Sequence, residues 1–158
     1  MDEYHKPVVI YDQVLGELTL DKDFGSFEGE IKWCGQKVLL SLEVNAENKA
    51  SWTRARSAAK KLLAESEIYD KAMRAFAAEK LTALANDWLS QDEENSRNFK
   101  TDPITEEELA SLISMINLSI TSGGSFIAWF DCDEMFTDHA VRVSGSIKKG
   151  IKSACIEG

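Results

Sequence analysis

The feature that most constrains the fold is a long helical stretch in the middle of the chain. Between Ser51 and Asn98 neither glycine nor proline occurs, and strong helix formers fill most positions. Apolar residues recur there every three or four positions in two successive runs, which is the spacing of one helical face. They are Trp52, Ala55, Ala59, Leu62 and Leu63, and then Tyr69, Met73, Ala77, Leu81, Leu84 and Trp88. Such a face needs an apolar surface to cover, and the flanking β-rich segments are the candidates.

A single helix across this whole stretch would be unusually long for a small domain. We therefore expect a bend at Ala64–Ser66, with Ser66 capping the second helix and Ser51 capping the first. After a polar stretch, Thr105–Glu108 fits the capping-box pattern and places three carboxylates in a first helical turn. This motif predicts a short third helix through about Ser114.

Both flanks of the helical stretch alternate apolar and polar residues with the period of a strand. The expected strands are Val8–Tyr11, Glu17–Asp21, Phe27–Trp33 and Val38–Val44 before the helices, and Ile116–Thr121, Phe126–Cys132, Val141–Ile147 and Ile151–Ile156 after them. The predicted fold class is α+β, with an antiparallel N-terminal β-meander, two to three central helices and an antiparallel C-terminal β-meander. The helices should pack on one side of the sheet. We expect one domain over residues 1–158, with a short flexible N-terminus at about 1–7.

The overall charge excludes several classes of partner. A net charge of −9 disfavours nucleic acid and anionic membrane surfaces, because both require clustered Lys and Arg. No apolar run reaches the length of a membrane span or a signal peptide, and no pattern predicts a cofactor. The three cysteines, Cys34, Cys132 and Cys155, form no CxxC pair. These features predict a cytoplasmic protein whose reduced cysteines serve as small core residues.

Only the first part of the helical stretch is basic. Residues 50–80 carry seven Lys or Arg against four Asp or Glu. Most of these charges stand four residues from an opposite charge, as in Glu67 to Lys71, Asp70 to Arg74 and Lys61 to Glu65. Such pairs usually mark a solvated helix surface, so we expect a self-paired face here in preference to a functional basic patch.

The densest polar cluster lies between two predicted strands, in the segment Asp131–His139. Its candidate binding residues are Asp131, Asp133, Glu134, Asp138 and His139, with the neighbouring Trp129 as an aromatic wall. Carboxylates and an imidazole can ligate a cation or act as an acid–base pair. The spacing does not match an EF-hand or an HExxH motif, and no motif of nucleophilic catalysis occurs in the chain. Three interpretations stay open: a solvated connection, a weak cation site and a catalytic site.

Several segments resemble, in order, a bacterial domain family of unknown function. They are LGELTLDKDFGSFEGEIKW (Leu15–Trp33), ALANDWL (Ala83–Leu89), ITEEEL (Ile104–Leu109) and MFTDHAVRVSGSIKKGIKSACIEG (Met135–Gly158). The family pattern is an LGELTLD start, helices ending in ANxWL, an ITEEE helix, and F-x-x-H before a V-x-G strand. The resemblance covers about Val14 to Gly158 and implies no substrate. Small acidic bacterial domains of this kind suggest, by analogy alone, an immunity protein against a toxin.

These observations lead to one main hypothesis and two rivals. The main hypothesis is a non-enzymatic interaction domain that binds a basic protein partner through three acidic segments, Asp92–Asp102, Glu106–Glu108 and Asp131–Asp138. The first rival is a small-ligand or metal-binding protein or an enzyme that uses Asp131–His139, with walls from Trp129 or Phe136. The second rival is a structural homo-oligomer that pairs through the final strand.

Overall fold

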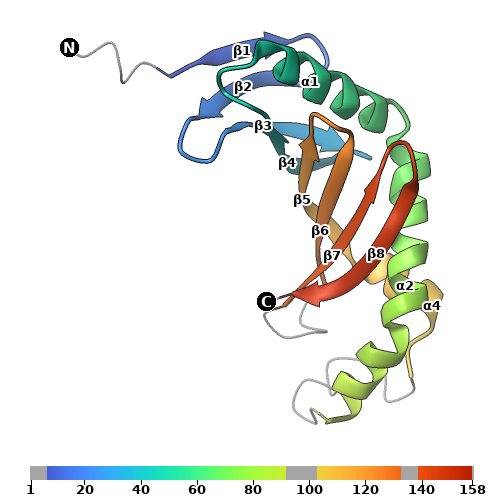
Figure 1. The fold of residues 1–158 in the computed structure, drawn as a ribbon. Coiled ribbons are helices and arrows are strands. Elements are labelled where there is room, and N and C mark those ends of the chain that lie inside the picture. Colours follow the sequence, from blue (N-terminus) through green and yellow to red (C-terminus); the bar gives the residue numbers. More distant parts are fainter. Residues whose placement is uncertain (1–6, 92–102, 133–138, 158) are drawn as a thin grey trace.

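The computed structural model describes residues 7–91, 103–132 and 139–157, and every structural statement below refers to these residues (Figure 1). The elements in chain order are β1 (Val9–Asp12), β2 (Gly16–Asp21), β3 (Ser26–Trp33), β4 (Gln36–Glu43), α1 (Lys49–Ala64), α2 (Ser66–Gln91), α4 (Glu106–Leu112), β5 (Ser114–Thr121), β6 (Ser125–Asp131), β7 (Ala140–Ser146) and β8 (Gly150–Glu157). Each predicted strand is therefore present, with ends that differ by a few residues.

The strands within the described ranges form one eight-stranded sheet whose spatial order follows the sequence, β1 to β8. All neighbours pair antiparallel except β4 and β5, which are parallel. A parallel pair needs a long crossover connection, and the helical part of the chain supplies it. The prediction of two antiparallel meanders is right within each half. It is wrong for the sheet as a whole, because the parallel β4–β5 pair joins the two halves into one mixed sheet. With its helices on one face, the fold is mixed α/β.

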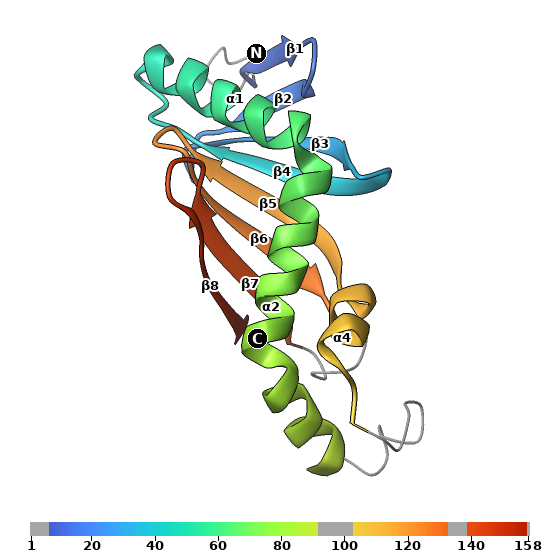
Figure 2. The same ribbon diagram turned by 90° about the vertical axis from the view of Figure 1, so that its right-hand side faces the viewer.

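The helices lie on one face of this sheet, as expected (Figure 2). The core between the two layers is apolar, and it is filled largely by the strand side chains that the alternation pattern places on one face. Its largest fully buried side chains are Trp33, Phe27, Phe126, Phe130, Leu15, Leu18, Leu40, Leu42, Leu62, Met73 and Leu109. The opposite face of the sheet is covered by no described helix.

The predicted bend in the helical stretch is confirmed, but its caps differ. The first helix ends at Ala64 and α2 begins at Ser66, so Ser66 lies inside the helix instead of capping it. The cap of α1 is Asn48, whose side chain accepts a hydrogen bond from the Ala50 amide at 3.0 Å. Ser51 is buried within the first turn, where its hydroxyl donates to the Asn48 carbonyl at 2.7 Å. A serine hydroxyl can cap a helix or donate to a nearby backbone carbonyl, and the buried Ser51 does the second.

The predicted capping box of the short helix is present. The Thr105 hydroxyl accepts from the Glu108 amide at 3.1 Å, and the Glu108 carboxylate accepts from the Thr105 amide at 3.3 Å. The helix ends at Leu112, two residues earlier than predicted, because Ser114 already begins β5.

Candidate functional site

The acidic segment Asp131–His139 connects β6 to β7 along the chain. Asp131 is the exposed last residue of β6, and half-buried His139 directly precedes β7. The His139 carbonyl accepts a hydrogen bond from the Cys132 thiol at 3.0 Å. Asp133, Glu134, Phe136 and Asp138 lie outside the described residues, as does the Asp92–Asp102 segment. The predicted site therefore stays a prediction; among described residues, no group of three or more His, Cys, Asp or Glu could hold a metal.

Trp129 occupies a different position from the other tryptophans whose side chains the structure describes. The indole N–H of Trp33 donates to Asp70 at 3.0 Å and that of Trp52 donates to the Asn45 carbonyl at 2.9 Å, as expected for packed tryptophans. Trp129 is half-buried on the uncovered face of the sheet, because its neighbours Ala128 and Phe130 are the residues of β6 that point into the core.

Trp129 belongs to a row of side chains that crosses the uncovered face. Strand registers place Leu39, Asn117, Trp129, Arg142 and Cys155 side by side on five successive strands. The Arg142 guanidinium lies 5.8 Å from the Trp129 ring centre and is thus positioned for a cation–π interaction. At the other end of the row Leu39 is 55 % exposed, which is unusual for a leucine in the interior of a sheet.

Carboxylates border the Leu39 end of this row, which we call the uncovered-face row. Glu30 is the register partner of Leu39, and Glu28 is the register partner of Ser41. Both glutamates and Glu43 are exposed, while Lys37 lies 3.7 Å from Glu30 in a surface ion pair. The row therefore combines exposed apolar area with a border of three carboxylates and two exposed lysines, Lys32 and Lys37.

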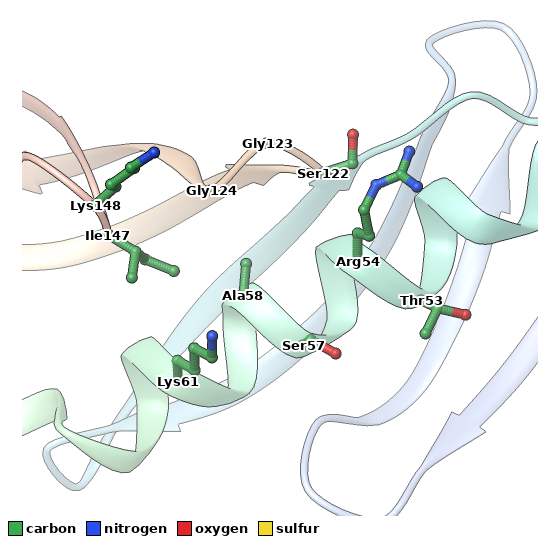
Figure 3. A pocket seen from close by; sticks show the side chains of 10 residues that line it. All are labelled: Thr53, Arg54, Ser57, Ala58, Lys61, Ser122, Gly123, Gly124, Ile147 and Lys148. Carbon is green, nitrogen blue, oxygen red and sulfur yellow. The ribbon is translucent and has the colours of Figure 1, made fainter.

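A pocket of about 500 Å³ opens on the other side of the molecule, between α1 and two hairpin turns (Figure 3). Its walls come from the β5–β6 turn, from the β7–β8 turn and from one stripe of α1 with the spacing i, i+3, i+4, i+7. The lining residues are Thr53, Arg54, Ser57, Ala58, Lys61, Ser122, Gly123, Gly124, Ile147 and Lys148. Three of them are cationic and none is acidic. We call this the α1 pocket.

The prediction of a self-paired basic face is only partly right. Asp70 and Arg74 pair at 2.8 Å as expected. Arg54, Lys61 and Lys148 are exposed, and within the described parts of the chain none of them forms an ion pair. The helical spacing of Arg54 and Lys61 was visible in the sequence, but the turns that complete the α1 pocket are brought to it only by the fold.

Two further cations of α1, Arg56 and Lys60, anchor the helix to the first strand. The buried Asp12 carboxylate accepts from Arg56 Nε at 3.0 Å, and Lys60 Nζ lies 2.9 Å from the same oxygen. Its other oxygen accepts from the amides of Val14 and Leu15 at 2.8 and 3.0 Å. Burial by itself raises the pKa of Asp12, but Lys60, the two amides and Arg56 together hold it well below its usual range. This cluster fastens β1 to α1 and is fully satisfied.

A second, smaller cavity of about 210 Å³ lies beside Cys34. Cys34 as a whole is exposed, but partial desolvation beside this cavity raises the pKa of its thiol, an effect that the Ser66 hydroxyl opposes, so the thiol is not activated as a nucleophile. The adjacent Asp70 accepts from Trp33, and Arg74 donates from the same network to the Ala110 carbonyl at 2.7 Å. These contacts tie β3, α2 and α4 together. The prediction of core cysteines is right for buried Cys132 and wrong for exposed Cys34.

The structure thus defines a layered domain in which three described helices cover one face of a mostly antiparallel sheet. A family model described as "Uncharacterized protein conserved in bacteria (DUF2262)" matches residues 12–156. The chain therefore belongs to this bacterial family, which confirms the resemblance found in the sequence. Comparisons with curated proteins and with solved structures gave no match. Among the described helices, none combines the length and apolarity that a bilayer crossing requires.

Proposed function

We propose that the protein is a non-enzymatic interaction domain that binds a basic protein partner over the uncovered face of its sheet. An immunity-like role, in which the partner is a toxin, is the specific form that the family analogy suggests. The single observation that carries the proposal is the uncovered-face row, with exposed Leu39 and half-buried Trp129 next to a carboxylate border.

The chemistry of this row suits a protein interface. Tryptophan and arginine are the residues that most often dominate binding energy, and the Arg142 guanidinium already lies over the Trp129 ring. Five strands about 4.8 Å apart make the row roughly 20 Å wide, which is adequate for a standard interface. Glu28, Glu30 and Glu43 would attract a basic partner and raise its association rate at low salt.

The test compares variants on the two faces of the protein. Tagged protein is expressed in a bacterial host of the family together with its neighbouring genes, and partners are recovered at low and high salt. We expect one basic protein to be retained at low salt by the wild type and by Ile68→Arg, which changes an exposed residue of α2. Leu39→Arg and Trp129→Ala should lose it. The proposal would be overturned if the tagged wild-type protein were recovered without a partner. It would also be overturned if Leu39→Arg and Ile68→Arg retained the partner equally.

The alternative use of Asp131–His139 as a ligand or cation site is separable from this proposal. A thermal-shift series with Ca²⁺, Mg²⁺, Mn²⁺ and Zn²⁺ tests it, because a cation at a hundred times its Kd stabilises the folded state by about 2.7 kcal/mol. A flat series would remove the cation hypothesis. The cytoplasmic location also stays a prediction; it is supported by three free cysteines, which are typical of reducing compartments.

A further inference from the structure

We propose that the α1 pocket binds a small organic molecule through a phosphate group. The pocket lies between α1 and the turns of the C-terminal half, and none of its lining residues belongs to the uncovered-face row or to the acidic segment. The inference does not depend on the proposed interaction function.

The first argument is the charge of the pocket wall. Arg54, Lys61 and Lys148 come from α1 and from the β7–β8 turn, and no carboxylate lines the pocket with them. Figure 3 shows their charged ends spaced around the hollow, where like charges repel each other and an anion between them relieves that repulsion. In a chain with a net charge of −9, three cations at one pocket with no ion pair to any described residue are unexpected from composition. Figure 3 shows Arg54 and Lys61 on the side of α1 that faces the turns.

The second argument is that the rim of the pocket is formed in advance. The Ile147 amide donates to the Gly124 carbonyl at 3.0 Å, so the two hairpin turns are joined to each other. Gly124 is buried with a φ of +88°, a backbone conformation that residues with a side chain rarely adopt. Its own amide donates to the Thr121 carbonyl at 3.0 Å. A ligand therefore meets a fixed wall and loses little free energy in ordering it.

The third argument concerns the kind of anion. A phosphate monoester carries a charge near −2 at neutral pH, which suits a site with three cations. The arginine fork can bind two phosphate oxygens at once, and lysines add point charges. The volume of about 500 Å³ lies in the range of small-molecule sites and exceeds what inorganic phosphate fills. Ala58 and Ile147 supply an apolar wall for the organic part.

The experiment is an amide NMR titration at constant ionic strength with three probes: ribose 5-phosphate, inorganic phosphate and ribose. We expect both phosphates to shift the Gly123, Gly124 and Lys148 amides, and ribose to shift none. Ribose 5-phosphate should bind more tightly than inorganic phosphate because its ribose contacts parts of the pocket that inorganic phosphate leaves empty. The variant Arg54→Gln/Lys148→Gln should weaken binding by at least roughly tenfold, since hydrogen bonds to charged groups are lost.

The matched control is Lys71→Gln/Lys152→Gln, which removes the same charge from exposed positions outside the pocket. It should bind ribose 5-phosphate as the wild type does. Equal loss in both double variants would show a diffuse ionic effect and overturn the proposal. The absence of shifts at the pocket amides with both phosphates would overturn it as well. Equal affinity for the two phosphates would overturn the assignment of an organic ligand. All substituted residues are exposed, and melting temperatures without ligand check that each variant folds.

Discussion

The substitution Asp12→Asn tests whether the anchor between β1 and α1 stabilises the fold as its geometry indicates. Asparagine keeps an oxygen that can accept from the Val14 and Leu15 amides. It removes the charge that Arg56 and Lys60 contact at 3.0 and 2.9 Å. The change therefore isolates the two ionic contacts from the turn that the same side chain holds.

The expected cost follows from the burial of the three partners. Breaking a fully buried ion pair by removing one partner costs about 3–5 kcal/mol. Asp12 is buried, but the side chains of Arg56 and Lys60 are 30 % and 40 % exposed and can recover water. Screening by this water lowers the estimate to about 2–3 kcal/mol. Asp12→Ala, which also removes both turn hydrogen bonds, should cost about 1–2 kcal/mol more.

The pH dependence gives an independent check with a definite sign. The pKa of Asp12 in the folded protein lies well below its usual range, whereas in the unfolded chain it is about 3.9. As the pH falls from about 5, the unfolded chain binds the proton first and the stabilisation is progressively lost. The difference in unfolding free energy between wild type and Asp12→Asn should therefore be full at pH 7 and smaller at pH 3.

Urea unfolding followed by tryptophan fluorescence at pH 7 and pH 3 measures this difference. All other carboxyl groups are common to both proteins, so their titration largely cancels. A difference below about 0.5 kcal/mol at pH 7 would place the mutation in the range of ordinary surface changes and refute the anchor. A difference that stays constant from pH 7 to pH 3 would refute the assignment of the low pKa to Asp12.

Three further substitutions test other local features by chemical denaturation. Thr105→Ala removes the capping box and should cost about 1 kcal/mol; no measurable loss would refute the cap. Gly145→Ala places a Cβ in collision with the Gly150 carbonyl oxygen, so β7 and β8 must separate, at a cost of about 2 kcal/mol or more. Trp33→Phe removes the donor to Asp70 and should cost about 1–2 kcal/mol, and a neutral result would show that water replaces the indole.

Local physics explains which parts of the fold could be predicted from the sequence. Strand alternation identified the buried face of β3, where Phe27 and Ile31 are buried while Glu28 and Glu30 are exposed. The bend followed from the length of the helical stretch, and its position from Ser66 as a candidate cap. Both features depend on residues that are neighbours in sequence, and neither needs knowledge of the rest of the fold.

Non-local contacts explain what could not be predicted. The parallel pairing of β4 with β5 joins segments separated by the whole helical region, and the alternation of each strand is the same for a parallel or an antiparallel neighbour. The prediction of ion pairs within the helices was only partly right for the same reason. Spacing suggested that Lys61 pairs with Glu65 four residues away, whereas Arg56 and Lys60 meet Asp12, 44 residues before Arg56.

Helical geometry shows why four of the five cations of α1 form two groups. At 100° per residue, Arg54 and Lys61 lie about 20° apart around the axis, and Arg56 and Lys60 lie about 40° apart on roughly the opposite side. One group meets the buried carboxylate of Asp12, and the other lines a pocket without a carboxylate. Neutralising Arg56 and Lys60 with glutamine should therefore lower stability by about 2 kcal/mol. The same change at Arg54 and Lys61 should leave stability within about 0.5 kcal/mol and alter anion binding instead. If both pairs changed stability equally, the basic part of the helix would be a single structural surface and the division would be wrong.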